Sequence, residues 1–193
     1  MQNGMTAVRL RPISESSLAG RVYWVTGLSG AGKTTLTTEL VARLRKDGVQ
    51  VVHVDGDAVR NMLGNDLGYD LKDRVANAYR ISGLCQFLQS QGVTVICSTM
   101  SLYPEIWKWN RENLQSYRLI YLRVSNQVLR QRDQKGLYSG VENGTCSNVV
   151  GVDLPFDEPK QPDLILDNNN SKQREININK LYQLVSEDNY EAR

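Results

Sequence analysis

The sequence contains few of the residues that most often bind transition metals. It has one histidine, His53, and three cysteines, Cys85, Cys97 and Cys146, among 193 residues. The cysteines lack the C-x-x-C spacing of zinc sites, so the sequence predicts no zinc centre. Cys85 and Cys97 lie in apolar segments, which favours small buried thiols. We expect three reduced cysteines, which are typical of a cytoplasmic protein because disulfides are rare in the cytosol.

Long hydrophobic runs and a large excess of one charge are also absent. No window offers the roughly 20 apolar residues that a membrane helix needs, and residues 1–20 lack the apolar core of a secretory signal. Lys and Arg number 23 against 21 Asp and Glu, a net charge of +2. A protein that coats nucleic acid needs a larger surplus of cations. We therefore expect no membrane and no nucleic acid among the partners. A homodimer is compatible with the same composition.

Strand and helix patterns alternate from residue 21 onward. Residues 1–20 show neither period, so we expect a flexible N-terminal extension and then a single domain over residues 21–193. The strands are expected at 21–27, 49–55, 93–100, 118–124 and 162–167, and the helices at 36–48, 73–92, 104–116, 125–133 and 174–187. Such alternation predicts an α/β fold with a mostly parallel five-stranded sheet and helices on both faces.

The segment from Gly27 to Thr34, GLSGAGKT, matches G-x-x-x-x-G-K-[ST] between a predicted strand and a predicted helix. Glycines let backbone amides turn toward a phosphate, Lys33 can bridge the β and γ oxygens, and Thr34 can ligate Mg²⁺. The alternative is a glycine turn that contains a lysine by chance. The motif predicts a P-loop NTPase-like three-layer sandwich that binds ATP and Mg²⁺. The expected ATP-binding residues are Gly27, Ser29, Gly30, Ala31, Gly32, Lys33, Thr34 and Thr35.

The second predicted strand ends in Asp55-Gly56-Asp57, and Arg60 follows. A carboxylate at this place faces the phosphate loop, where it can hold Mg²⁺ through water or accept a proton from an acceptor hydroxyl. The alternative is an Asx turn that caps the next helix. No guanine-binding N-K-x-D string follows the later strand RLIYLRVSN, which disfavours a GTPase.

A basic cluster precedes a long irregular stretch. Arg130, Arg132 and Lys135 lie where P-loop kinases close a lid over ATP, and residues 136–161 are rich in Gly, Asn and Pro. We expect a lid or substrate loop, although an exposed charged helix end would have the same composition. Together with Arg118 and Arg123, the cluster predicts positive potential directed at two small anions.

Five motifs stand in an order that resembles the adenylylsulfate kinase family. They are GLSGAGKTT, VDGDAVRNMLGNDLGY, DRVANAYRI, RDQKGLY and GVDLPFDEP followed by PDLILD, and they span Arg21 to Asn168. The resemblance implies a P-loop kinase domain that phosphorylates the ribose 3'-hydroxyl of adenosine 5'-phosphosulfate with Mg-ATP. Asp55, Lys33 and Ser101 would then be catalytic, Thr34 and Asp55 would hold Mg²⁺, and Arg132 would contact ATP. The implied acceptor-binding residues are Asp57, Arg60, Tyr69, Arg74, Asn77, Met100, Ser101, Lys135, Leu137 and Val149.

Several positions depart from the family pattern. The Phe-Ile-Ser-Pro loop of the family is Thr99-Met100-Ser101-Leu102 here, and Tyr69 replaces a Phe but keeps a ring. Val149 stands where the family has the second ring of an adenine sandwich, and a Ser139-Gly140 pair replaces two basic residues. The strings CSTMSLYPEIWKWN and NVVGVD are similar to a branch that phosphorylates cytidine diphosphoramidate in capsule modification. That acceptor is the alternative, and a non-catalytic nucleotide-binding module is the second alternative.

Two further observations concern packing. His53 lies inside a strand pattern, which predicts packing in the core or at a sheet edge. Trp107 and Trp109 are two apart on a predicted helix, so one is expected in the core and the other at the surface or an interface.

Overall fold

The computed structural model describes residues 20–64 and 66–190. Its five strands form one parallel sheet in the order β2-β3-β1-β4-β5. Their bounds are β1 Val22–Thr26, β2 Val51–Asp55, β3 Thr94–Ser98, β4 Tyr117–Arg123 and β5 Leu164–Asp167. The predicted sheet is confirmed, and every strand pair in it is parallel.

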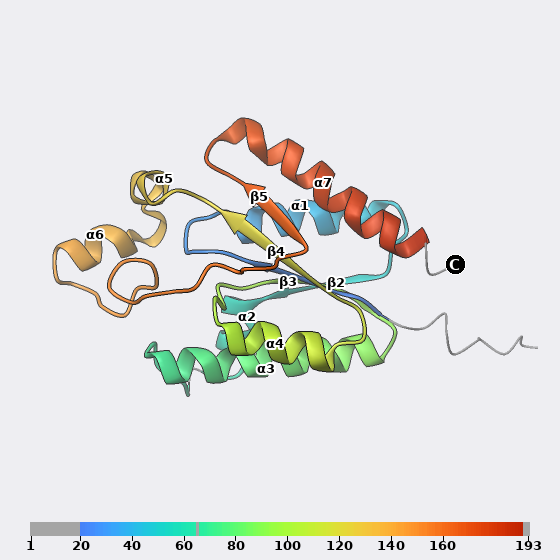
Figure 1. The fold of residues 1–193 in the computed structure, drawn as a ribbon, viewed down its shortest axis with the longest axis horizontal. Coiled ribbons are helices and arrows are strands. Elements are labelled where there is room, and N and C mark those ends of the chain that lie inside the picture. The colour runs from blue at the N-terminus through green and yellow to red at the C-terminus, as the bar shows by residue number, and fades with distance from the viewer. Residues whose placement is uncertain (1–19, 65, 191–193) are drawn as a thin grey trace, which may run out of the picture.

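Helices cover both faces of the sheet (Figure 1). One face carries α1 (Lys33–Lys46) and α7 (Ser171–Tyr190), and the other carries α3 (Leu71–Ser90) and α4 (Pro104–Asn113). This arrangement confirms the three-layer α/β sandwich. None of the helices in the described ranges is both long and apolar enough to cross a membrane.

The central strand β1 explains why the sheet is buried from both sides. All five of its residues are buried, and Tyr23 and Trp24 are among the largest enclosed side chains. Strands of a parallel sheet pack helices on both faces and therefore read as continuous apolar runs rather than as alternating ones. The run VYWVT fits that rule, and it ends where Gly27 begins the phosphate loop.

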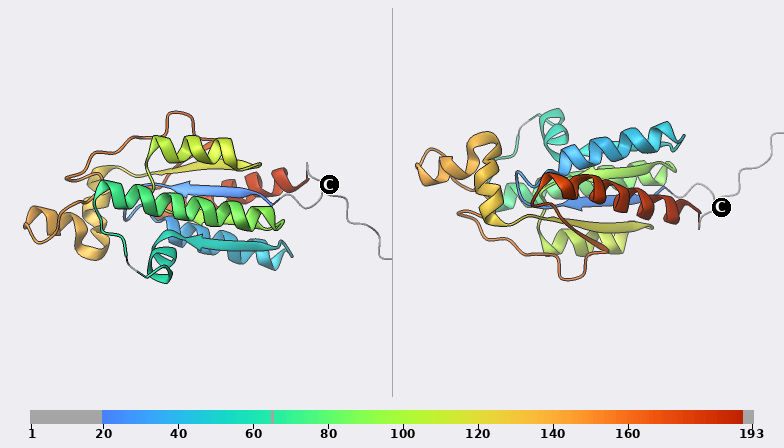
Figure 2. Two further views of the ribbon diagram at one scale, coloured as in Figure 1. Left: turned by 90° about the horizontal axis from the view of Figure 1, so that it is seen from below. Right: turned by 90° about the horizontal axis from the view of Figure 1, so that it is seen from above.

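Three short helices lie around the carboxyl ends of the strands. They are α2 (Gly56–Met62), α5 (Asn126–Arg132) and α6 (Leu137–Glu142), with a 3-10 turn, η2 (Gln134–Gly136), between the last two. In Figures 1 and 2, α5 and α6 project beyond the end of the sheet at which the strands terminate. The expectation that residues 136–161 are irregular is therefore wrong at its start, because η2 and α6 occupy residues 134–142.

The prediction that five basic residues between Arg118 and Lys135 create one region of positive potential is wrong in part. Arg118 lies near the start of β4, at the far end of the sheet from the phosphate loop, where its guanidinium binds Asp188 on α7. Arg123 pairs with Asp167, and Arg130 with Glu142. These three arginines serve ion pairs in the fold, so the span does not act as one patch. The expectation for residues 1–19 lies outside the described residues.

Candidate active site

The phosphate loop connects β1 to α1 with glycines in conformations that other residues rarely adopt. Gly32, the residue before α1, has φ of 97°, and an added Cβ would lie 2.9 Å from the Asn168 amide nitrogen. At Gly27 a Cβ would lie 2.4 Å from the Leu122 carbonyl oxygen. Glycine is required at both positions because a side chain would meet its neighbours. The predicted strand, loop and helix are thus present in the expected order.

Lys33 extends back over the phosphate loop. Its ammonium donates hydrogen bonds to the carbonyl oxygens of Gly27, at 2.8 Å, and Leu28, at 2.9 Å. Burial lowers the pKa of Lys33 to about 8, and the nearby carboxylates of Asp57 and Asp55 oppose that shift. A desolvated ammonium surrounded by backbone carbonyls gains strongly from a bound phosphate oxygen, because the phosphate supplies a full negative charge.

Asp55 stands at the carboxyl end of β2 and uses its two oxygens differently. Oδ1 accepts the backbone N–H groups of Asp57 and Ala58 and so caps α2. Oδ2 accepts the hydroxyls of Thr34, at 2.8 Å, and Ser98, at 3.0 Å. Burial alone would raise the pKa of Asp55, but these hydrogen bonds outweigh it, and the pKa lies below its usual value. The Asp55 carboxylate therefore forms the Asx turn that caps α2 and also faces the phosphate loop.

The oxygens of Thr34 and Asp55 form a donor set that suits Mg²⁺. Hydroxyl and carboxylate oxygens are hard ligands, and Mg²⁺ in kinases is bound through one or two of them together with substrate phosphates. Within residues 20–64 and 66–190 no group of three or more His, Cys, Asp or Glu side chains converges. A site of this kind depends on the nucleotide for most of its ligands, as expected for Mg-ATP.

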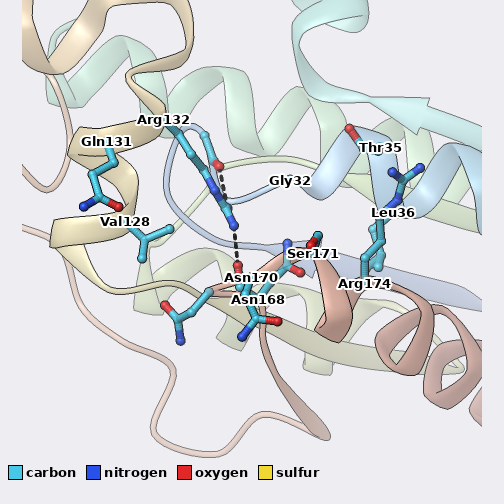
Figure 3. Close-up of a pocket in the computed structure, with 12 residues that line it drawn as sticks. Gly32, Thr35, Leu36, Val128, Gln131, Arg132, Asn168, Asn170, Ser171 and Arg174 are labelled. Carbon is cyan, nitrogen blue, oxygen red and sulfur yellow. Dashed lines mark hydrogen bonds between the residues drawn. The ribbon is translucent and has the colours of Figure 1, made fainter.

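A cavity of about 490 Å³ opens beside the phosphate loop (Figure 3). Arg132 of α5 reaches across it and donates to the carbonyl oxygens of Gly30, at 3.2 Å, and Asn168, at 2.7 Å. The Asn168 amide donates in turn to the Ala31 carbonyl, at 2.8 Å. The loop, α5 and the end of β5 are thereby joined around one space. Its lining residues are Gly30, Gly32, Thr35, Leu36, Val128, Gln131, Arg132, Asn168, Asn169, Asn170, Ser171 and Arg174.

The predicted acceptor side gathers around Tyr69. The guanidinium carbons of Arg60 and Arg74 lie 4.7 and 5.3 Å from the centre of its ring. Arg74 also donates to the carbonyl oxygens of Tyr69 and Asn148, each at 2.7 Å. Asn77 is buried one turn further along α3. The structure therefore brings two guanidinium groups together around one aromatic ring.

The lid residues contact both halves of this region. The Lys135 ammonium lies 2.7 Å from a carboxylate oxygen of Asp57, and the Tyr138 hydroxyl donates to the Ser29 carbonyl at 2.9 Å. Leu137 is half-buried, and Val149 is buried in the loop that follows α6. Segments on the phosphate side and on the acceptor side are thus both tied to residues 135–149.

Ser101 and Met100 lie less directly in the site. Ser101 is buried, with its hydroxyl 2.9 Å from the Thr99 hydroxyl, and its carbonyl accepts the Trp107 indole N–H at 3.1 Å. Met100 is half-buried, and its carbonyl accepts the Thr26 hydroxyl at 3.0 Å. The catalytic role expected for Ser101 stays a prediction, and its hydroxyl faces Thr99.

Two residues of the region were missed by sequence reasoning, Ser98 and Asn168. Each stands at or just beyond the carboxyl end of a strand, Ser98 in β3 and Asn168 after β5. Ligands of open parallel sheets bind at that edge, so polar residues closing a predicted strand were the available signal.

Fold and site together define a P-loop kinase. A phosphate loop after β1, a carboxylate at the end of β2 and a lid with basic residues meet at the carboxyl edge of a parallel sheet. The chain belongs to the adenylylsulfate kinase family, since the model of the family described as adenylylsulphate kinase matches residues 19–167. It is an ATP-dependent phosphotransferase with an alcohol acceptor and Mg²⁺ as its metal cofactor.

Individual relatives differ in the acceptor that their names give. The chain is 41% identical over 162 residues to an adenylyl-sulfate kinase of Deinococcus deserti, covering 84% of this chain and 88% of the relative. It is 40% identical over 164 residues to the cytidine diphosphoramidate kinase of Campylobacter jejuni, with 83% and 95% covered. The solved APS kinase of Mycobacterium tuberculosis in complex with AMPPNP and APS has a TM-score of 0.78 at 30% identity, with 90% and 98% covered.

Proposed function

We propose that the protein transfers the γ-phosphoryl group of ATP to the ribose 3'-hydroxyl of adenosine 5'-phosphosulfate. The observation that carries this proposal is the Lys135–Asp57 ion pair, at 2.7 Å, which joins the lid to the acceptor side next to Asp55 and Lys33. Asp57 lies on the acceptor side and Lys33 on the phosphate side. An acceptor hydroxyl and a γ-phosphate bound there would therefore lie next to each other. The names of several relatives support the same acceptor.

Each residue has a defined task in this reaction. Mg²⁺ bound with ATP supplies positive charge to the phosphoryl oxygens. Lys33 binds the transferred group from the loop side, and Arg132 adds charge from the lid. Asp55 orients the acceptor hydroxyl, whose oxygen forms the new bond to phosphorus while the bond to ADP breaks. Asp55 accepts the proton that the hydroxyl loses as the new bond forms.

A second acceptor, cytidine diphosphoramidate, is favoured by Val149. The family pattern has an aromatic ring at this place, and the aliphatic side chain removes half of a stacking sandwich around adenine. A pyrimidine has less stacking area to lose. The 40% identity to the Campylobacter jejuni enzyme is in line with this alternative.

An acceptor panel separates these possibilities. Coupled ADP release would be measured with Mg-ATP and either adenosine 5'-phosphosulfate or cytidine diphosphoramidate. We expect the sulfate nucleotide to give the larger kcat/KM. A larger value with the cytidine nucleotide would establish the alternative, and no ADP with either would favour a non-catalytic nucleotide-binding module. Lys33→Ala is the control, because it should abolish ADP release while leaving the thermal unfolding transition cooperative.

Assembly and location are part of the same proposal. We propose a cytoplasmic location, in line with the free thiols of Cys85, Cys97 and Cys146. We also propose a homodimer, since Met62 and Leu63 are exposed beside a cavity of about 410 Å³ that Leu84 also lines. Apolar surface of this kind is often covered by another chain. Light scattering should give the mass of two chains, and the mass of one chain would reject the dimer.

A further inference from the structure

His53 occupies a position from which it can act on the catalytic carboxylate. It lies in β2 two residues before Asp55, and alternate residues of a strand point to the same face of a sheet. The side chain is half-buried rather than enclosed in the apolar core. It is the sole histidine of the sequence.

The imidazole contacts two hydroxyls that border the site. Its Nε2 atom lies 2.8 Å from the Thr37 hydroxyl on α1 and 3.2 Å from the Ser98 hydroxyl on β3. Ser98 in turn donates to Oδ2 of Asp55 at 3.0 Å, and Thr34 donates to the same oxygen at 2.8 Å. His53 is therefore one hydroxyl away from the oxygen that faces the phosphate loop.

Proton counting assigns a donor to Nε2. The ionised Asp55 can only accept, so the single hydroxyl proton of Ser98 is directed at Oδ2. Thr37 lies 2.9 Å from the Lys33 carbonyl oxygen, which likewise can only accept, so its proton is also committed. Both hydroxyl oxygens are then left to accept, and Nε2–H is the group that can donate to them. The neutral tautomer with the proton on Nε2 satisfies every contact.

The surrounding charges agree with a neutral ring. Burial lowers the pKa of His53, Asp55 opposes this shift, and Arg45 adds to it. Arg45 itself is bound to the Val51 carbonyl at the start of β2. The hydroxyl contacts themselves, and not this shift, place a proton on Nε2.

We propose that His53 is a positioning residue for phosphoryl transfer, a role that rests on the proposed function. Its Nε2–H holds the Ser98 hydroxyl so that the proton of this hydroxyl points at Oδ2 of Asp55. The same group bonds Thr37 on α1, the helix that begins with Lys33 and Thr34. His53 thereby fixes the carboxylate relative to the helix that carries the phosphate-binding residues.

A matched pair of substitutions tests the kinetic role. His53→Gln keeps an N–H donor near the Nε2 position, whereas His53→Leu fills the site without one. Loss of one neutral hydrogen bond predicts a kcat about 2- to 10-fold lower in His53→Leu, with both KM values nearly unchanged and most of the rate retained in His53→Gln. Equal kcat values in the two variants, with both still folded by thermal denaturation, would overturn the proposal.

A double-mutant cycle shows whether His53 acts through Ser98. In a Ser98→Ala background, His53→Leu should lower kcat no further, because the hydroxyl that it orients is absent. Independent, multiplying losses would mean that His53 acts by another route.

A spectroscopic measurement separates this proposal from the identity of the acceptor. In tag-free protein the sole histidine gives one set of long-range ¹H–¹⁵N correlations, which distinguish the two tautomers. We expect the Nε2–H form near neutral pH, and its partial loss in Ser98→Ala. An Nδ1–H form would refute the assignment even if turnover is found with either acceptor. The Nε2–H form would uphold the hydrogen bond from His53 to Ser98 even if both acceptors fail.

Discussion

Tyr69 presents an aromatic face beside two guanidinium groups, and 59% of the residue is exposed. An exposed ring contributes little to the core, so its removal tests recognition rather than folding. Stacking of a base on an aromatic side chain contributes about 1–3 kcal/mol. Tyr69→Ala should therefore raise the KM for the acceptor by about 5- to 150-fold and leave the KM for ATP unchanged. Steady-state kinetics with each substrate varied in turn provides the measurement.

Tyr69→Phe is the matched control for this prediction. It keeps the ring between Arg60 and Arg74 and should retain a KM near that of the wild type. If Tyr69→Ala changed both KM values alike, the residue would act on the general shape of the site and not on the acceptor base.

Residue by residue, contiguous motifs were predictable and cross-strand contacts were not. The phosphate loop is recognisable because its glycines, Lys33 and Thr34 follow one another in the chain. The contact of His53 with Ser98 joins residues 45 positions apart, and it exists because β2 and β3 are neighbours in the sheet. The pattern around His53 predicted its strand, which is confirmed, but carried no information about the hydroxyls opposite it.

Among the elements, α6 was missed for a physical reason. Its six residues include Gly140, and glycine normally weakens a helix. Here an added Cβ would lie 2.5 Å from the Cys146 sulfur, so the close return of the chain requires glycine inside the helix. Local composition therefore indicated a loop, whereas tertiary packing stabilises a helix.

The helix α5 offers a direct test of the lid. Arg132 and Arg130 lie on the same helix and are both exposed, but Arg132 binds Gly30 and Asn168, whereas Arg130 pairs with Glu142. A charge-assisted contact contributes about 1.5–3 kcal/mol. Arg132→Ala should thus lower kcat/KM for ATP by about 10- to 150-fold, and Arg130→Ala by less than about 2-fold. Equal losses in the two variants would show that the charge of α5, and not the contact of Arg132 with the loop, is what matters.

At the scale of the whole molecule, basic residues form two separate groups, one at each end of the sheet. Lys33, Arg132 and Lys135 lie around the carboxyl ends of the strands, while Arg21 and Arg118 lie at the opposite end. The sequence reveals which residues are charged and which strands exist. It does not reveal the strand order, because β1 pairs with β3 and β4, which are distant in the chain. Arg118 lies at the end opposite the phosphate loop because it stands near the start of β4.

Asp188 anchors α7 at that opposite end and should contribute to stability without affecting catalysis. It is 4% exposed and accepts hydrogen bonds from Tyr23, at 3.1 Å, and from Arg118, at 3.1 and 2.7 Å, with Arg21 at 3.7 Å. Asp188→Asn leaves these cations without a buried anion and should lower the free energy of unfolding by about 3 kcal/mol near neutral pH.

Burial raises the pKa of Asp188, but Arg118 and the other partners lower it below the model-peptide value of 3.8. A carboxyl with a lower pKa in the folded state stabilises the protein above its unfolded pKa, and this contribution is lost as pH falls through the folded value. The difference in urea denaturation between wild type and Asp188→Asn should therefore be constant from about pH 7 to about pH 5 and shrink below about pH 4. A difference that persists unchanged at about pH 3 would assign the stabilisation to packing, and a changed kcat/KM in the folded variant would place Asp188 in communication with the active site.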